Sequence, residues 1–207
     1  MGPGEDIVLS TKNGRAIRFD HTDVRPMGRT ATGVRGIKLR GEDEVVGMAI
    51  VKPGANLLTI CQNGYGKQTP FGHDTSEVPA PEDENAEMPE NVEVPETEET
   101  AEGAENADSS ARSYRRQTRG GMGIMDIRTS QRNGSVIGIA VVFPGDQILM
   151  MTARGKIQRM NVDEVRVTGR NTQGVRIMNV DADDRLVAVK VVPVEENAPI
   201  GDEEDEA

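Results

Sequence analysis

The sequence contains very few aromatic residues and a single cysteine. Its 207 residues include no Trp, two Tyr and three Phe, so a buried core must be built from Val, Ile, Leu and Met. Cys61 has no second cysteine to pair with, which excludes an internal disulfide and predicts a reducing, cytoplasmic environment. No apolar run approaches the roughly 20 residues that cross a bilayer, and no signal peptide is apparent, so we expect no membrane association.

The sequence also lacks the motifs of common catalytic and metal sites. It has no G-x-x-x-x-G-K-[ST] loop, and His21 and His73 have no Cys or His at metal-ligand spacing, which predicts surface positions for both. Tyr114 lies beside basic residues, but no base or metal cluster that would activate it as a nucleophile is apparent. We therefore expect no catalytic residues, no metal site and no cofactor in this chain.

Basic residues are absent from two stretches that carry most of the acidic charge. Residues 77–108 contain 13 Asp and Glu, and residues 195–207 contain 7 more. The net charge of −11 therefore conceals a body in which all 24 Lys and Arg face only 15 acidic residues, a net charge of +9. Because both stretches are rich in Glu, Pro, Ala and Asn, we predict a disordered acidic insertion at about 75–112 and a disordered tail over 194–207.

The rest of the sequence is a threefold repeat of about fifty residues. Each copy opens with a strand, a glycine turn and a second strand: "DIVLSTKNGRAIRF" (6–19), "NLLTICQNGYGKQT" (56–69) and "QILMMTARGKIQRM" (147–160). Gly14, Gly64 and Gly155 take the same place in the three turns. Asn-Gly, found in the first two, is a strong hairpin signal because both turn residues adopt positive φ.

The repeat predicts an all-β fold of about three blades, each with four antiparallel strands. After a less regular segment, each copy ends on one more apolar strand, at 44–51, 135–143 and 185–192. We place the blades at about 5–53, 54–144 and 145–193 of a single domain that spans 1–193, and call these ranges the first, second and third repeats. Tandem hairpins in a β-sandwich are the alternative, but the constant period favours propeller-like blades.

Basic residues recur at equivalent positions of the repeats. They are Arg25 with Arg115 and Arg166, Arg29 with Arg119 and Arg170, Arg15 with Lys156, Arg18 with Arg159, and Arg35 with Arg176. A charge repeated in every blade forms a stripe along one rim, and the arginine fork suits phosphate. With no recognition helix and few aromatics for base stacking, we predict duplex DNA binding through phosphates with little sequence preference. The predicted DNA-binding residues are Arg15, Arg18, Arg25, Arg29, Arg35, Lys67, Arg115, Arg116, Arg119, Gly120, Gly121, Gly123, Lys156, Arg159, Arg166, Arg170 and Arg176.

Three segments carry a resemblance to a known family: "QNGYGKQTP" (62–70), "GRTATGVRGIKL" (28–39) and "VTGRNTQGVRI" (167–177). They resemble the C-terminal DNA-wrapping domain of the DNA gyrase A protein. The resemblance implies a β-pinwheel in which neighbouring blades exchange a strand; members usually have six blades, and these three are similar to the last three. It also implies duplex DNA bending in support of ATP-dependent supercoiling, a gyrase B partner in an A2B2 enzyme, and ATP and Mg²⁺ at other domains or subunits.

The segment "QTRGGMG" (117–123) is similar to the glycine-rich box of that family, Q-R-R-G-G-K-G. Thr118 and Met122 replace basic residues of the box, so we expect a degenerate blade loop that adds some phosphate contact. Two alternatives remain open: the equivalent C-terminal domain of topoisomerase IV, and a propeller-like scaffold for proteins, which would expose apolar patches. Any enzymatic role would belong to the type IIA topoisomerase that the resemblance implies, because this chain shows no catalytic residues.

Overall fold

The computed structural model describes residues 5–72 and 113–193. His73 and the whole of both predicted disordered segments lie outside the described residues. The strands are β1 Asp6–Thr11, β2 Arg15–Asp20, β3 Val45–Ile50, β4 Asn56–Cys61, β5 Tyr65–Pro70, β6 Ile124–Met125, β7 Val136–Val142, β8 Gln147–Thr152, β9 Ile157–Asn161, β10 Val175–Arg176 and β11 Leu186–Val192. Two short 3-10 helices, η1 His21–Asp23 and η2 Val162–Glu164, follow β2 and β9.

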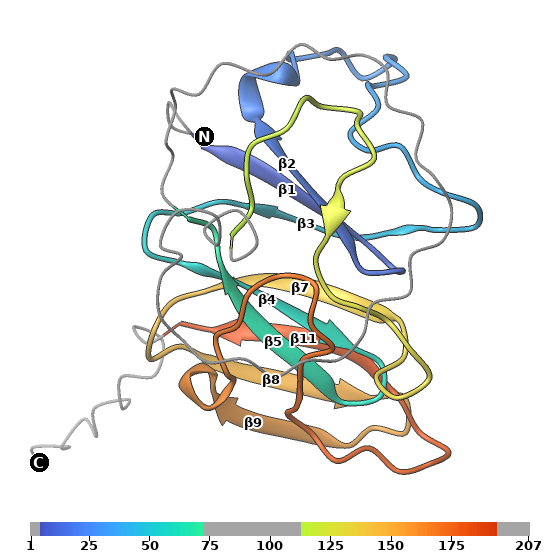
Figure 1. Cartoon of the computed structure of the whole chain (residues 1–207), viewed down its shortest axis with the longest axis vertical. Coiled ribbons are helices and arrows are strands. Elements are labelled where there is room, and N and C mark those ends of the chain that lie inside the picture. The colour runs from blue at the N-terminus through green and yellow to red at the C-terminus, as the bar shows by residue number, and fades with distance from the viewer. Residues whose placement is uncertain (1–4, 73–112, 194–207) are drawn as a thin grey trace, which may run out of the picture.

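The strands form three antiparallel sheets that lie one above the other (Figure 1). Their strand orders are β3-β1-β2-β6, β10-β5-β4-β7 and β11-β8-β9. Each sheet is centred on one predicted hairpin, whose turn glycine has a φ of about +80°: 81° at Gly14, 80° at Gly64 and 85° at Gly155. The prediction of all-β blades is confirmed.

Neighbouring repeats exchange a strand. β6 belongs to the second repeat but pairs with β2 of the first sheet, where Met125 lies opposite Arg15. β10 belongs to the third repeat and pairs with β5 of the second sheet, where Arg176 lies opposite Tyr65. This is the exchange that the family resemblance implies.

Two parts of the repeat do not match the expected four strands per blade. The segment of the first repeat that is equivalent to β6 and β10 forms no strand, and the third sheet has three strands. Both differences have one physical reason. An exchanged strand forms only where a neighbouring sheet offers an edge. Among residues 5–72 and 113–193, no further sheet is stacked beyond the first sheet or beyond the third.

Aliphatic side chains fill the spaces between the sheets, as the composition predicts. One cluster, which includes Val8, Leu57 and Phe71, joins the first and second sheets. A larger one, which includes Leu58 and Ile148, joins the second and third. Cys61 is fully buried in β4, and burial raises the pKa of its thiol to about 12. No helix within the described ranges is long and apolar enough to cross a membrane.

Candidate nucleic-acid interface

Two of the predicted DNA-binding arginines connect neighbouring repeats. Arg119 donates from Nε to the carbonyl of Asp23 (3.0 Å) and from Nη1 to that of Arg35 (2.6 Å). Arg170 donates at the equivalent place in the next repeat, to Ser113 (2.7 Å) and Met125 (3.3 Å). Both guanidinium groups are half-buried, and each links its own repeat to the preceding one by two hydrogen bonds.

Arg18 is buried, which contradicts its predicted place on a DNA-binding rim. It is 3% exposed, lies 2.6 Å from an Asp6 carboxylate oxygen, and donates to the carbonyls of Phe71 (2.9 Å) and Tyr114 (3.0 Å). Gln68 stands at the equivalent position of the second repeat and donates in the same way to two carbonyls of the third. The position serves contacts between repeats, because its side chain points into the next sheet.

Lys67 is also buried rather than on the surface, and is fully enclosed. Its Nζ lies 3.1 Å from Asp126 Oδ1 and donates to the carbonyls of Asp126 (2.7 Å) and Gly169 (3.0 Å). Burial lowers the pKa of Lys67, and the charge of Asp126 opposes that change. We therefore exclude Lys67 and Arg18 from the proposed interface.

Tyr114 completes this buried polar group. Its hydroxyl donates to Asp126 Oδ1 over 2.5 Å, and Thr59 donates to the other carboxylate oxygen over 2.8 Å. Burial and then the charge of Asp126 raise the pKa of Tyr114 well above its usual range. A buried, protonated phenol cannot reach a DNA phosphate, which agrees with the expectation that Tyr114 is not a nucleophile.

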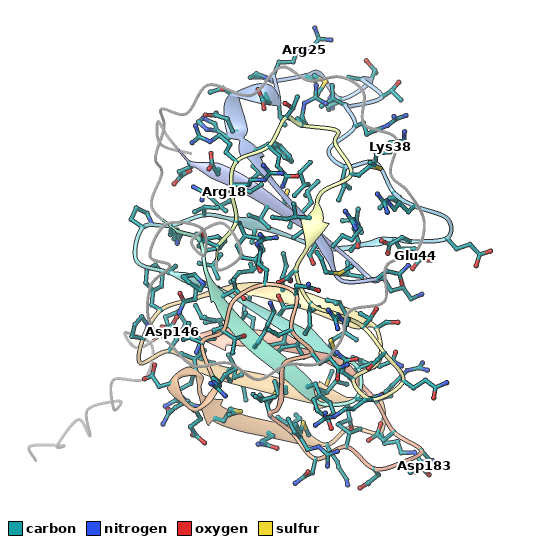
Figure 2. All side chains as sticks on the ribbon, viewed as in Figure 1. Arg18, Arg25, Lys38, Glu44, Asp146 and Asp183 are labelled. Carbon is teal, nitrogen blue, oxygen red and sulfur yellow. The ribbon has the colours of Figure 1, made fainter. Side chains whose placement is uncertain are left out.

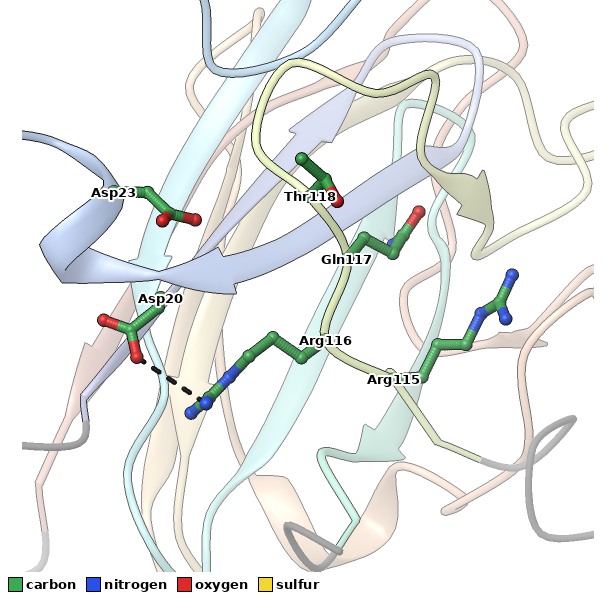
Figure 3. Close-up of a pocket in the computed structure, with 6 residues that line it drawn as sticks. All are labelled: Asp20, Asp23, Arg115, Arg116, Gln117 and Thr118. Carbon is green, nitrogen blue, oxygen red and sulfur yellow. Dashed lines mark ion pairs between the residues drawn. The ribbon is translucent and has the colours of Figure 1, made fainter. Parts of the chain in front are cut away.

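Arg116 lies at the surface and is paired with carboxylates. It contacts Asp6 (2.8 Å) and Asp20 (3.6 Å) at an open hollow that Arg115, Gln117 and other residues also line (Figure 3). Hydrogen bonds from Thr22, and to a lesser extent the charge of Arg116, lower the pKa of Asp20. The charge of Arg116 is therefore largely balanced within the protein.

Several other predicted residues also have partners in the fold. Arg15 donates to the carbonyls of Met122 (2.9 Å) and Gly123 (2.7 Å). Lys156 pairs with Asp181, Arg159 donates to Gln147, and Arg176 donates to the Tyr65 hydroxyl over 3.0 Å.

The glycines of segment 117–123 pack against the first repeat. Gly120 donates its N–H to the carbonyl of Gly36 (2.8 Å), and Gly121 donates to that of Thr118 (3.3 Å). A Cβ on Gly123 would lie 2.6 Å from the carbonyl oxygen of Ala16. The N–H groups of Gly120 and Gly121 are used inside the protein, so this loop is a contact between repeats rather than a phosphate cradle.

Five of the predicted arginines remain exposed, and their side chains make no hydrogen bond or ion pair with another residue of the described ranges. They are Arg25, Arg29, Arg35, Arg115 and Arg166. Arg25, Arg115 and Arg166 are equivalent. Arg25 and Arg166 lie five residues beyond the hairpins that end at Asp20 and Asn161, whereas Arg115 follows the segment outside the described residues. Figure 2 shows Arg25 pointing away from the fold. Nothing in the described ranges assembles three metal-ligating side chains.

One sequence signal could have separated these arginines from the buried ones. Positions 18, 68 and 159 each face a polar partner twelve residues earlier, in the pairs Arg18–Asp6, Gln68–Asn56 and Arg159–Gln147. A basic residue that lies diagonally across from an acid or amide on the adjacent strand is more readily explained by the fold than by a ligand.

Stacked sheets that exchange strands between neighbouring repeats are the architecture of a β-pinwheel, a propeller-like fold. The family model described as "DNA gyrase C-terminal domain, beta-propeller" matches residues 5–52, 109–142 and 146–193, and the chain belongs to this family. The DNA gyrase A protein of Chlamydia pneumoniae is 34% identical over 194 residues, which are 93% of this chain and 18% of that protein. The gyrase A protein of Salmonella typhimurium is 34% identical over 200 residues, 97% of this chain and again 18% of the relative. The chain thus spans about a fifth of these proteins.

Two solved structures share the fold. The structure of a DNA gyrase A C-terminal domain superposes with a TM-score of 0.68 at 25% identity, over 92% of this chain and 52% of that one. The C-terminal domain of DNA topoisomerase IV also gives 0.68, at 20% identity, over 92% of this chain and 47% of that one. The second likeness concerns the fold alone.

Proposed function

We propose that this chain binds duplex DNA through its phosphates, without sequence preference, and bends it around the side of the stacked sheets. The observation that carries the proposal is the set Arg25, Arg115 and Arg166: one exposed arginine per repeat, at one position, with no side-chain partner in the described protein. Equivalent positions of stacked repeats follow one side of the stack, so the three charges form a curved row. Arginine stays charged at any physiological pH and suits phosphate oxygens.

The remaining features support phosphate contact over base reading. The body outside the two acidic stretches carries +9. The helices of the described ranges, η1 and η2, have three residues each, too few to lie in a major groove. Such an interface gives affinity that depends strongly on salt.

We further propose that the chain acts as part of a gyrase A protein in the cytoplasm, beside gyrase B, and supports ATP-dependent negative supercoiling. The gyrase relatives at 34% identity favour this assignment over topoisomerase IV. ATP and Mg²⁺ would bind at other domains or subunits. A protein scaffold is the other alternative, and it predicts no salt-dependent affinity for DNA.

Fluorescence anisotropy with two duplexes of unrelated sequence tests the binding. Both should bind equally, and log K should fall with log salt at a slope of about −4 to −5 if about five phosphates are neutralised. Religation of a nicked plasmid in the presence of the chain tests wrapping, because a wrapped duplex leaves a change in linking number. Binding without that change would favour a domain that only holds DNA, and affinity independent of salt would refute the proposal.

A triple variant tests the residues. Replacing Arg25, Arg115 and Arg166 by Ala should reduce the magnitude of the salt slope by about 3. The matched control replaces Arg40, Arg128 and Arg185, which are exposed in the loops before β3, β7 and β11, at the other end of the sheets. Equal weakening by both variants would show that total charge, not the row of arginines, governs binding.

A further inference from the structure

The sequence contains three Asn-Gly pairs, at 13–14, 63–64 and 133–134. In such a pair the glycine nitrogen can attack the side-chain amide carbon of the asparagine, because glycine has no side chain to hinder the approach. A C–N bond closes a cyclic imide, the amide C–N bond breaks, and the glycine proton leaves with the amide nitrogen as ammonia. Water then opens the imide to aspartate or to isoaspartate, whose main chain is one methylene longer.

The first two pairs lie in hairpin turns with the same main-chain contacts. Each glycine N–H donates to the carbonyl three residues earlier, over 3.0 Å at Gly14 and 3.2 Å at Gly64. Each glycine carbonyl accepts two N–H groups from the next repeat, over 2.9 and 3.2 Å at Gly14 and over 2.8 and 3.1 Å at Gly64. The two glycine nitrogens are therefore restrained alike, and a difference in reactivity must come from the asparagine side chains.

The three asparagine side chains have different surroundings. Nδ2 of Asn63 donates to two main-chain carbonyls, over 3.1 and 3.2 Å. Asn133 is fully buried, its Nδ2 also donates to two carbonyls, and its Oδ1 accepts from the N–H and the hydroxyl of Ser130. Asn13 is exposed, and its side chain makes no hydrogen bond with another residue of 5–72 and 113–193. The structure thus leaves one of the three amides unrestrained.

We propose that Asn13 is a site of spontaneous deamidation in the folded protein, and that Asn63 and Asn133 are protected. An amide held by hydrogen bonds must lose them before its carbon can turn toward the glycine nitrogen, whereas the Asn13 amide has only to rotate in solvent. Asn13 should therefore deamidate at least about tenfold faster than Asn63, whose amide must release two hydrogen bonds.

Isoaspartate at position 13 would weaken the contact between the first and second repeats. The added methylene displaces the carbonyl of Gly14, which accepts from the N–H groups of Asp126 and Ile127. The turn has no room to move toward the second repeat, because a Cβ on Gly14 would already lie 2.0 Å from the carbonyl oxygen of Ile127. The aspartate product leaves the main chain unchanged and adds only a charge at an exposed position. Deamidation at Asn13 thus weakens this contact slowly and irreversibly, through isoaspartate.

Incubation of the whole chain in mildly alkaline buffer, followed by peptide mass spectrometry, tests the site. Cleavage after glutamate places the three Asn-Gly pairs in separate peptides, 6–42, 45–77 and 106–164. We expect the amide to become an acid at Asn13, and isoaspartate, detected by enzymatic methylation, to be confined to the first peptide. In guanidinium chloride the three pairs should react at similar rates, because their side-chain hydrogen bonds are lost. Folded protein in which Asn13 reacts no faster than the other two would overturn the proposal.

Two variants at the same position test the consequence. Glutamine would have to form a larger ring, so Asn13→Gln should keep its melting temperature through the same incubation, whereas the original chain should acquire a fraction that melts at lower temperature. Asn13→Asp carries the charge of one product on an unchanged main chain and should melt like the fresh protein. An equal loss in aged Asn13→Gln would refute the link to this site, and a low melting temperature in fresh Asn13→Asp would refute the role of the longer main chain. DNA has no part in these measurements, so this proposal and the proposed function can fail separately.

Discussion

Equivalent residues of the repeats have different surroundings at the contacts between repeats and at the two ends of the stack. Arg119 and Arg170 are half-buried and bind four main-chain carbonyls, whereas the equivalent Arg29 is exposed. Gly14 and Gly64 touch a neighbouring carbonyl, whereas Gly155 touches nothing. A repeated residue therefore does not have a repeated role. Its role depends on whether a neighbouring sheet covers it.

The largest effect is expected at the buried pair of Lys67 and Asp126 in the second repeat, which lies between the other two repeats. Asp126→Ala leaves the Lys67 ammonium buried without its countercharge and should lower the free energy of unfolding by about 3–5 kcal/mol. Urea unfolding measures the loss. The first repeat has Ile17 where the second has Lys67, so Lys67→Ile in the Asp126→Ala background should recover part of it. A double variant no more stable than Asp126→Ala would show that the two charges are not coupled.

The turn glycines should give the next largest difference. Gly64→Ala places a Cβ about 2.1 Å from a carbonyl oxygen, so the contact between the second and third repeats must shift, at a cost of about 2–4 kcal/mol. Gly155→Ala has the same unfavourable φ but no clash, so it should cost about 1–2 kcal/mol in dilute protein. Thermal unfolding of both variants measures the difference. Equal costs would mean that φ alone matters and that the covered turn is loosely packed against its neighbour.

The three equivalent arginines should give a smaller effect on stability. Arg119→Ala or Arg170→Ala removes two hydrogen bonds from a charged donor and should cost about 1–3 kcal/mol. Arg29→Ala should change stability by less than about 0.5 kcal/mol in dilute protein. The sequence alone places the three arginines at equivalent positions of one rim and does not distinguish them. Equal melting temperatures for the three variants would contradict the inference that Arg119 and Arg170 stabilise the contacts between repeats.

The smallest effect concerns pH and Cys61. The folded state raises the pKa of this thiol to about 12, whereas an unfolded thiol has a pKa of about 8.5. Its contribution to stability is therefore fully present below pH of about 8.5 and is lost as the pH rises toward 12. Between pH 8 and 9.5 the loss should be about 1 kcal/mol.

The repeat itself supplies the matched variant for this measurement. Thr11 and Thr152 occupy the position of Cys61 in the other sheets, and each hydroxyl accepts from a backbone N–H of its own hairpin. Cys61→Thr should therefore fold and should lose this part of the alkaline dependence. Urea unfolding at both pH values measures it. An unchanged dependence would assign the loss to other groups, such as Tyr114.

The sequence determined the parts of this protein that depend on short segments of chain. The repeat period, the hairpins at Gly14 and Gly64 and the aliphatic core all follow from local patterns, because turn geometry and strand alternation are set by neighbouring residues. The family resemblance added the strand exchange. The row of Arg25, Arg115 and Arg166 could also be predicted from the sequence, because its members occupy one equivalent position in the three repeats.

Only the tertiary structure decided which basic residues face solvent. Arg119 contacts Arg35 across 84 residues of sequence, Arg18 contacts Tyr114 across 96, and Lys67 contacts Gly169 across 102. The residues next to Arg119 and Lys67 do not distinguish them from Arg25 or Arg115, because all four lie in polar, glycine-containing segments. Burial and pairing are properties of the sheet packed alongside, and its position is fixed by the exchanged strands rather than by the residues next to each arginine.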